Sequence, residues 1–319
     1  MRKARRLIFL LAGACFLALS GCSESVNKEE NVDAAGKEEA KKEEEKKKPP
    51  VVEVVDPNTN EVIKVFEPEK AEDKEQYRLE IEQWAKEIAR GTETTEGYDQ
   101  RMVPDRIGED GKIIKGSPQV ILEEKELVDS ILKASEKGGR VTLPLYTTES
   151  RYDPEEVPFL DEVVVSTYTT YYNQNVPGRA KNIELSAAAI NNVIIGAGDP
   201  FSFNTTVGPS DEAHGYQPAE VAVNGRLVMG IGGGICQTSS TLFNAVDYLG
   251  VDYIERHNHS VNVSYVPKGR DAAVSYGGID FRFKNTTGVP LLLKAYAKNG
   301  VLTVEVRTSK KNYEKIKSM

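Results

Sequence analysis

The composition of residues 23–50 limits where this chain can form a packed core. The segment consists mainly of Glu, Lys, Ala and Asn, ends in Lys-Lys-Lys-Pro-Pro, and has almost no apolar surface to bury. This pattern predicts a disordered, charged linker that separates the folded region from the N-terminal residues. We therefore expect the folded part of the chain to begin near residue 51.

The residues before the linker have the pattern of an export signal. Four basic residues among the first six precede an apolar stretch at 7–19, which is too short to cross a bilayer as a mature helix. The stretch ends in Leu-Ser-Gly-Cys, which resembles the bacterial lipobox, with Cys22 as the lipidated residue. Residues 1–22 are thus predicted to be a lipoprotein signal peptide. The mature protein is expected to be extracytoplasmic and lipid-anchored to the outer face of the cytoplasmic membrane.

The remainder is predicted to be α+β, with two parts. Residues 51–160 are expected to form a small α+β module, with hairpins at 51–66 and 106–114 and helices at 69–90 and 124–137. Residues 161–310 are expected to form a mixed α/β domain. It begins with a strand at 163–172 and a helix at 183–197, and has Asn-Gly turns at 224–225 and 299–300. Its last strands are predicted to be antiparallel, at 260–266, 280–284, 290–296 and 302–307.

Cys236 is the only thiol expected in the mature folded part, because Cys15 lies in the signal and Cys22 carries the lipid. An exported cysteine normally has a disulfide partner, and this one has none within the chain. It follows a glycine run and precedes a buried helix predicted at 238–249. A cysteine at a helix N-terminus is close to the positive end of the helix dipole, which favours the thiolate. Cys236 is therefore a candidate nucleophile.

Two histidines follow this helix in the run Glu-Arg-His-Asn-His-Ser. In an extended segment His257 and His259 would point to the same face, so either could accept the thiol proton. We favour His259 as the base because it lies nearer the strand predicted at 260–266, with His257 left to bind or orient. Thiol, imidazole and backbone donors together are the cysteine form of acyl-transfer chemistry.

Other residues near the cysteine are candidates for binding an oxyanion or a substrate. Backbone N–H groups around Gly233, Gly234 and Gln237 would hold an oxyanion, and Ser239 could hydrogen-bond near the thiolate. Arg256 could bind a substrate carboxylate, as could Arg270 and Arg282, although each is as readily explained by a structural ion pair. Asp280 could orient a histidine.

Two other interpretations of Cys236 remain open. It could be a small buried hydrophobe, but glycines and hydroxyl side chains surround it in the sequence. It could also bind zinc together with His214, His257 and His259, although the spacing matches no standard motif. We expect no metal and no cofactor, and we interpret His214 as a solvated loop residue. The net charge of −8 and the lack of Lys/Arg blocks in the folded region argue against nucleic acid as a partner.

Residues 166–307 resemble the VanW family of cell-envelope proteins. The resemblance rests on seven blocks in family order, among them Phe-Ser-Phe-Asn at 201–204, Gly-Gly-Gly-Ile-Cys-Gln-Thr-Ser-Ser-Thr-Leu at 232–242, Glu-Arg-His-Asn-His-Ser at 255–260 and Tyr-Val-Pro-Lys-Gly-Arg-Asp at 265–271. It implies a cysteine L,D-transpeptidase that crosslinks peptidoglycan stem peptides, with Cys236 as nucleophile. Residues 139–154 look like the end of a peptidoglycan-binding module. The alternative is a non-catalytic lipoprotein that binds peptidoglycan.

Overall fold

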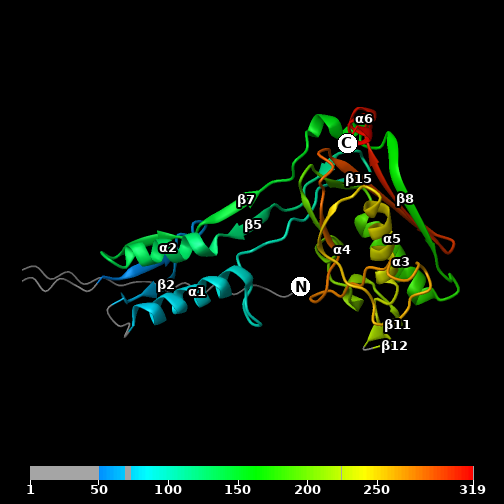
Figure 1. Ribbon diagram of the computed structural model, residues 1–319. Coiled ribbons are helices and arrows are strands. Elements are labelled where there is room, and N and C mark those ends of the chain that lie inside the picture. The colour runs from blue at the N-terminus through cyan, green and yellow to red at the C-terminus, as the bar shows by residue number, and fades with distance from the viewer. Residues whose placement is uncertain (1–49, 69–72, 224, 319) are drawn as a thin grey trace, which may run out of the picture. The chain divides into compact units, whose positions relative to one another are not determined.

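The computed structural model describes residues 50–68, 73–223 and 225–318 (Figure 1). The predicted signal peptide, Cys22 and all but the last residue of the linker lie outside these ranges. The described chain is mixed α+β with several antiparallel sheets, which confirms the predicted fold class. Among the described residues, no helix combines the length and the apolar content needed to cross a bilayer.

The first hydrophobic core contains the two helices and the hairpin predicted near the start of the folded region. Strands β1 (Val52–Val55) and β2 (Val62–Phe66) pair antiparallel, and β6 (Gly139–Thr142) pairs parallel with β1. Helices α1 (Lys74–Arg90) and α2 (Glu124–Ala134) lie side by side (Figure 1) and bury one face each in this core. Asp73 caps α1. Strands β5 (Gln119–Leu122) and β7 (Leu145–Thr148) form a separate antiparallel pair.

A six-stranded sheet carries the second core. Its order is β4 (Ile113–Ile114), β3 (Arg106–Ile107), β9 (Val193–Ile195), β15 (Leu291–Lys298), β16 (Val301–Thr308) and β8 (Val163–Tyr171). The β15–β16 hairpin turns at Asn299 and Gly300, whose φ angles of 53° and 80° are those that an Asn-Gly turn provides. The hairpin at 106–114 was expected within the first module. It adds to the edge of this sheet through β3 and β9.

Two helices pack on this sheet. α3 (Pro177–Ile190) contacts β15, and α5 (Ile235–Asp247) contacts β8 and β16. The helix predicted at 183–197 is wrong in its second half. Asn191 is extended and Asn192 has a φ of 62°, so the chain leaves the helix and pairs with β15 as β9. Residues 193–195 therefore pair in the sheet, although their apolar spacing also fits a helix.

A second, three-stranded sheet lies next to α5. It consists of β10 (Pro200–Ser202), β14 (Arg282–Lys284) and β13 (Asp252–Glu255), with the short helix α4 (Phe203–Val207) following β10. Strands β11 (Pro218–Val223) and β12 (Arg226–Ile231) form a hairpin, as predicted. The strand predicted at 260–266 is wrong, since the described chain contains no strand between Glu255 and Arg282. Short 3-10 turns at Pro154–Phe159 and Glu212–His214 and a final helix α6 (Lys310–Lys317) complete the elements.

Phe281 joins the second sheet to α5, and its removal tests this core. Its fully buried ring lies 5.8 Å from Phe243 of α5 and 5.6 Å from Phe283, centroid to centroid. We expect Phe281→Ala to lower the free energy of unfolding by about 3–5 kcal/mol, because a large cavity replaces the ring. Urea unfolding measures the loss. The control is Phe159→Ala, whose ring is 54% exposed; equal losses in the two variants would contradict the assigned core.

Candidate active site

The start of α5 places Cys236 where two elements meet. α5 begins at Ile235, one residue before the cysteine, and its N-cap Gly234 has a φ of 115°. A Cβ on Gly234 would lie 3.0 Å from Ile183 Cγ1 and 3.1 Å from the Arg179 carbonyl oxygen. On Gly233 a Cβ would lie 2.5 Å from the Glu220 carbonyl oxygen. The glycines therefore let the backbone pass between α3 and β11, which fixes the position of the helix start.

The hydroxyl side chains that follow Cys236 hydrogen-bond neighbouring elements and so fix the start of α5 in place. Thr238 hydrogen-bonds Ser186 of α3 at 2.7 Å, and Thr241 hydrogen-bonds Thr170 of β8 at 2.8 Å. Ser239 Oγ donates to the Ala272 carbonyl at 2.6 Å. These side chains are fully buried, and their polar atoms have protein partners, as burial requires. The surroundings of Cys236 are therefore polar and ordered, unlike an apolar core around a packing cysteine.

The Cys236 thiol is half-buried and has two polar neighbours. Its Sγ lies 3.3 Å from the Val274 carbonyl oxygen, to which it donates, and His259 lines the same cavity, where its imidazole interacts electrostatically with Cys236. The structure thus brings the predicted nucleophile together with the histidine favoured as its base.

His259 is held by a carboxylate that the sequence hypothesis did not include. Its Nδ1 lies 2.7 Å from Asp271 Oδ2, and both side chains are only 8% exposed. Asp271 also accepts from Asn258 Nδ2 at 2.7 Å and from the His259 backbone N–H at 2.6 Å. Because Nδ1 faces Asp271, Nε2 is the ring nitrogen left for Cys236. Cys236, His259 and Asp271 form a thiol–imidazole–carboxylate series.

The electrostatics of this series favour a charged imidazole. Burial lowers the pKa of His259, but hydrogen bonds to Cys236 and Asp271, with the negative charges on these groups, outweigh it and raise the pKa above the usual 6.5. Burial of Asp271 raises its pKa, but the hydrogen bonds from His259 and Asn258 outweigh this effect and lower it. The arrangement therefore stabilises an imidazolium at His259.

His257 is placed elsewhere. Its Nε2 lies 3.2 Å from Glu255 Oε1, and its side chain is 44% exposed. The two histidines do not share a face, because the chain stops being a strand after Glu255. An isolated backbone bridge between His257 and Ala273 instead holds 257–259 beside 271–274. This bridge brings Asp271 to His259 and the Val274 carbonyl to Cys236.

Cys236 and His259 open on a cavity of about 700 Å³. Its walls come from residues 232–237, the β11–β12 hairpin and the loops 261–265 and 273–279. Tyr265 lines it, and burial, followed by the negative charge of Cys236, raises the pKa of its hydroxyl. Tyr265 was not among the predicted site residues, although it stands in a block on which the family resemblance rests.

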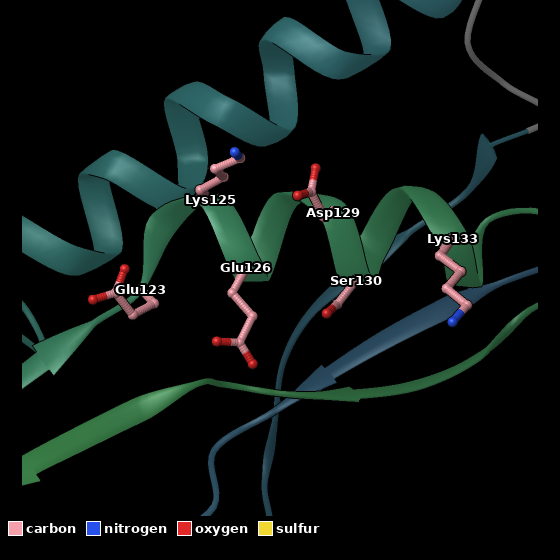
Figure 2. A pocket seen from close by; sticks show the side chains of 6 residues that line it. All are labelled: Glu123, Lys125, Glu126, Asp129, Ser130 and Lys133. Carbon is pink, nitrogen blue, oxygen red and sulfur yellow. The ribbon is translucent and has the colours of Figure 1, made fainter.

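A second hollow, of about 400 Å³, lies along α2. It is lined by six polar side chains, which Figure 2 shows projecting in different directions from the helix. They do not converge on a common point, and none is a histidine or a cysteine. Convergent polar groups are what a binding site requires, so the cavity beside Cys236 is the candidate active site.

Of the residues predicted to bind an oxyanion or a substrate, some line the cavity and others do not. Gly233, Gly234 and Gln237 line the cavity. The Gln237 N–H donates to the Gly234 carbonyl at 2.9 Å, and the Gln237 side chain is bonded to Arg179, Thr170 and Tyr171. The first turn of a helix leaves N–H groups without helical acceptors. Those of Gly234 and Cys236 are therefore the better placed donors for an oxyanion.

Ser239 and the three arginines considered from the sequence do not line the cavity. Arg256 donates to the carbonyls of Gly269 and Asp271, and stacks over Phe243 at 4.5 Å, so it supports the loop that carries Asp271. Arg270 pairs with Asp247 at 2.6 Å and Arg282 with Glu255 at 3.7 Å.

Asp280, suggested as a partner for a histidine, has other partners. It is fully buried and accepts from Ser202 Oγ at 2.6 Å and from the Asn204 backbone N–H at 2.9 Å. The four-ligand zinc arrangement is not formed either. His214 is exposed beside Asp211, and within the described ranges no three His, Cys, Asp or Glu side chains are grouped to hold a metal ion.

A family model described as VanW like protein matches residues 178–307. These residues form a VanW-like domain. The VanW-like domain contains Cys236, His259 and Asp271, and the family resemblance seen in the sequence is confirmed.

Two curated relatives match the chain. The uncharacterized protein YoaR of Bacillus subtilis (strain 168) is 41% identical over 171 residues, which cover 54% of this chain and 56% of YoaR. The vancomycin B-type resistance protein VanW of Enterococcus faecalis (strain ATCC 700802 / V583) is 31% identical over 140 residues, or 40% of this chain and 51% of the relative. The chain thus spans about half the length of each relative. No solved structure matches.

Proposed function

We propose that this chain is a cysteine acyltransferase of the cell wall, with L,D-transpeptidase-like activity on peptidoglycan stem peptides. The observation that carries the proposal is the series Cys236–His259–Asp271, which opens on a cavity of about 700 Å³. The proposal includes export and a lipid anchor at Cys22, which would hold the domain on the outer face of the cytoplasmic membrane.

In the proposed mechanism, each residue of the series has one role. His259 Nε2 takes the thiol proton, while Asp271 orients the ring and stabilises the imidazolium. The Cys236 thiolate attacks the carbonyl on the L-centre side of the terminal D-Ala bond of a donor stem. The first-turn N–H groups of Gly234 and Cys236 stabilise the oxyanion.

Collapse of the tetrahedral intermediate breaks the bond to D-Ala, and His259 returns the proton to the leaving amine. The product is a thioester on Cys236. The side-chain amine of a diamino acid on a neighbouring stem then attacks this thioester, His259 accepts the amine proton, and the thiol is regenerated as the crosslink forms. Attack by water instead would make the enzyme a carboxypeptidase.

The comparisons support a cell-wall role at a coarser level. The name of the E. faecalis relative associates that protein with vancomycin B-type resistance. A substrate in the cell wall is consistent with that name and with the export signal predicted at residues 1–22. The competing hypothesis is a non-catalytic lipoprotein whose cavity binds peptidoglycan. The position of Cys236 and His259 in the wall of one cavity favours a catalyst.

The test is product analysis of sacculi rich in tetrapeptide stems. Wild-type protein is expected to release D-Ala and to form new stem dimers linked through the L-centre carbonyl. Cys236→Ala and Cys236→Ser are expected to form neither, because no thioester can form. Fragment-ion mass spectrometry locates the new bond. Identical product profiles for wild type and Cys236→Ala, with both proteins folded, would eliminate the transferase and leave the binding protein.

A further inference from the structure

One guanidinium lies in the wall of the cavity beside Cys236. Arg179, in the first turn of α3, is the only Lys or Arg among the residues that line the cavity in the described chain. Arg256, Arg270 and Arg282 are outside the wall and have structural partners. A cation that faces the space beside a nucleophile can bind an anionic part of a substrate, so the partners of Arg179 decide whether it is free to do so.

The Arg179 guanidinium is fixed on one side only. Its Nη2 donates to Gln237 Oε1 at 2.8 Å, and its Cζ lies 5.9 Å from the centroid of the Tyr265 ring. In the part of the chain that the structure describes, no carboxylate lies within ion-pair distance of Arg179. Glu220, the acidic residue that lines the same cavity, does not pair with it either. A guanidinium has five N–H donors. Those not used by Gln237 have no acceptor among the described residues.

Three contacts place this cation beside the nucleophile. Its partner Gln237 is the residue after Cys236, and the Arg179 carbonyl lies against Gly234, the N-cap of α5. The Tyr265 ring under the Arg179 guanidinium lines the same cavity as Cys236, and its hydroxyl interacts with the charges of both residues. The bond to Gln237 also restricts the rotation of the guanidinium. A restricted planar fork with free donors is the geometry that binds a carboxylate in a bidentate manner.

We propose that Arg179 forms a carboxylate subsite next to Cys236, which binds a free carboxylate group of the acyl donor beside the bond that is broken. The identification of this donor as a stem peptide rests on the proposed function. Two carboxylates of a stem have the required chemistry: the C-terminal group of the leaving D-amino acid, and the side-chain carboxylate of a diamino diacid.

The subsite is tested first without a peptide substrate. Iodoacetate and iodoacetamide alkylate a thiolate in the same way, with loss of iodide, but only iodoacetate carries a carboxylate. We expect Arg179→Gln to lower the ratio of their alkylation rates at Cys236 by about fivefold, because one nearby charge is removed from a partly screened site. Any change in the reactivity of the thiolate itself affects both reagents and cancels in the ratio. Peptide mass spectrometry of the full chain measures alkylation of Cys236 separately from alkylation of Cys15 and Cys22.

Two variants control this measurement. Lys181→Gln removes a positive charge from the same helix two residues away, at an exposed position outside the cavity wall, and is expected to leave the ratio unchanged. Arg179→Lys keeps the charge but loses the planar fork. Its ratio of iodoacetate to iodoacetamide alkylation rates is expected to stay close to that of wild type. If wild type and Arg179→Gln have the same ratio, or if Lys181→Gln lowers it equally, the subsite is ruled out. This result does not depend on whether the protein forms crosslinks.

Tetrapeptide stems then identify the bound carboxylate. One substrate is amidated at the terminal D-Ala and another at the side chain of the diamino diacid. The group that Arg179 binds is expected to be the one whose amidation raises KM in wild type but not in Arg179→Gln. If both amidated stems are affected equally in the two proteins, the assignment to the acyl donor is overturned. If wild type turns over the stems but Arg179→Gln has the same alkylation ratio as wild type, the subsite is ruled out and the proposed function is retained.

Discussion

Replacement of His259 by alanine is expected to lower kcat/KM for D-Ala release by about 10³–10⁴-fold, because within the described residues His259 is the only imidazole in the cavity wall beside Cys236. The position of His259 in the same cavity wall as Cys236, and the 2.7 Å hydrogen bond from Nδ1 to Asp271, support this histidine as the proposed proton acceptor. The rate of D-Ala release from a synthetic tetrapeptide stem measures the loss. The rate of iodoacetamide labelling at Cys236 is expected to fall with it, because the thiolate loses its counter-charge.

His257→Ala is the matched control, since it removes the same side chain two residues away. The His257 ring is 44% exposed, lies beside Glu255 and does not line the cavity. We expect this variant to remain close to wild type in both assays. The reverse result, a large loss in His257→Ala and near wild-type rates in His259→Ala, would overturn the assignment of the base.

Asp271→Asn is expected to lower kcat/KM by about 10²–10⁴-fold while the protein stays folded. An amide can still hydrogen-bond Nδ1, but it carries no negative charge to stabilise the imidazolium, and it can present an N–H where the ring needs an acceptor. Asp211→Asn is the control, because Asp211 makes a similar 2.6 Å contact with His214 at an exposed position that is not part of the cavity wall. Equal activity of the two Asn variants would exclude Asp271 from the catalytic series.

The pH dependence of Asp271→Asn separates an electrostatic role from simple damage. The pKa of His259 is raised above 6.5 in the folded chain, so the folded state holds the proton more tightly than the unfolded state. This contribution stabilises the fold fully below about pH 6.5 and is lost as the pH rises through the raised pKa. In Asp271→Asn we expect the NMR titration of the His259 ring to move to lower pH. We also expect the pH-dependent part of the free energy of unfolding to shrink, and an unmoved titration would contradict the role of the carboxylate.

Local patterns in the sequence were enough to find the elements near the nucleophile. The helical spacing after Cys236 and the glycines before it predicted that a helix starts at the thiol, and α5 begins at Ile235. The Asn-Gly turn at 299–300 joins β15 and β16, as expected. These features depend on contacts between residues a few positions apart, and such contacts can be read from periodicity and turn chemistry.

The errors occur where distant segments compete for the same residues. Residues 193–195 fit the apolar period of α3, but β15 pairs with them and makes them a strand. Residues 260–266 have strand composition, yet they form a loop whose side chains line the cavity. The two histidines were expected on one face, and the backbone bridge from His257 to Ala273 separates them. Pairing across tens of residues decided all three, and local propensity does not contain that information.

The sequence by itself determined that this chain has one thiol in its folded part, that the thiol stands at the start of a helix, and that two histidines follow within reach. It also indicated the VanW-like domain that the family model matches at residues 178–307, because whole blocks of residues around that thiol carry the resemblance. Only the tertiary structure decided that His259 shares a cavity wall with the thiol, that Asp271 hydrogen-bonds the imidazole ring, and that Arg179 lines the same cavity. The physical reason is that a hydrogen-bonded series needs atoms placed within about 3 Å of one another. In this chain that placement depends on loops whose conformation is set by the elements they pack against.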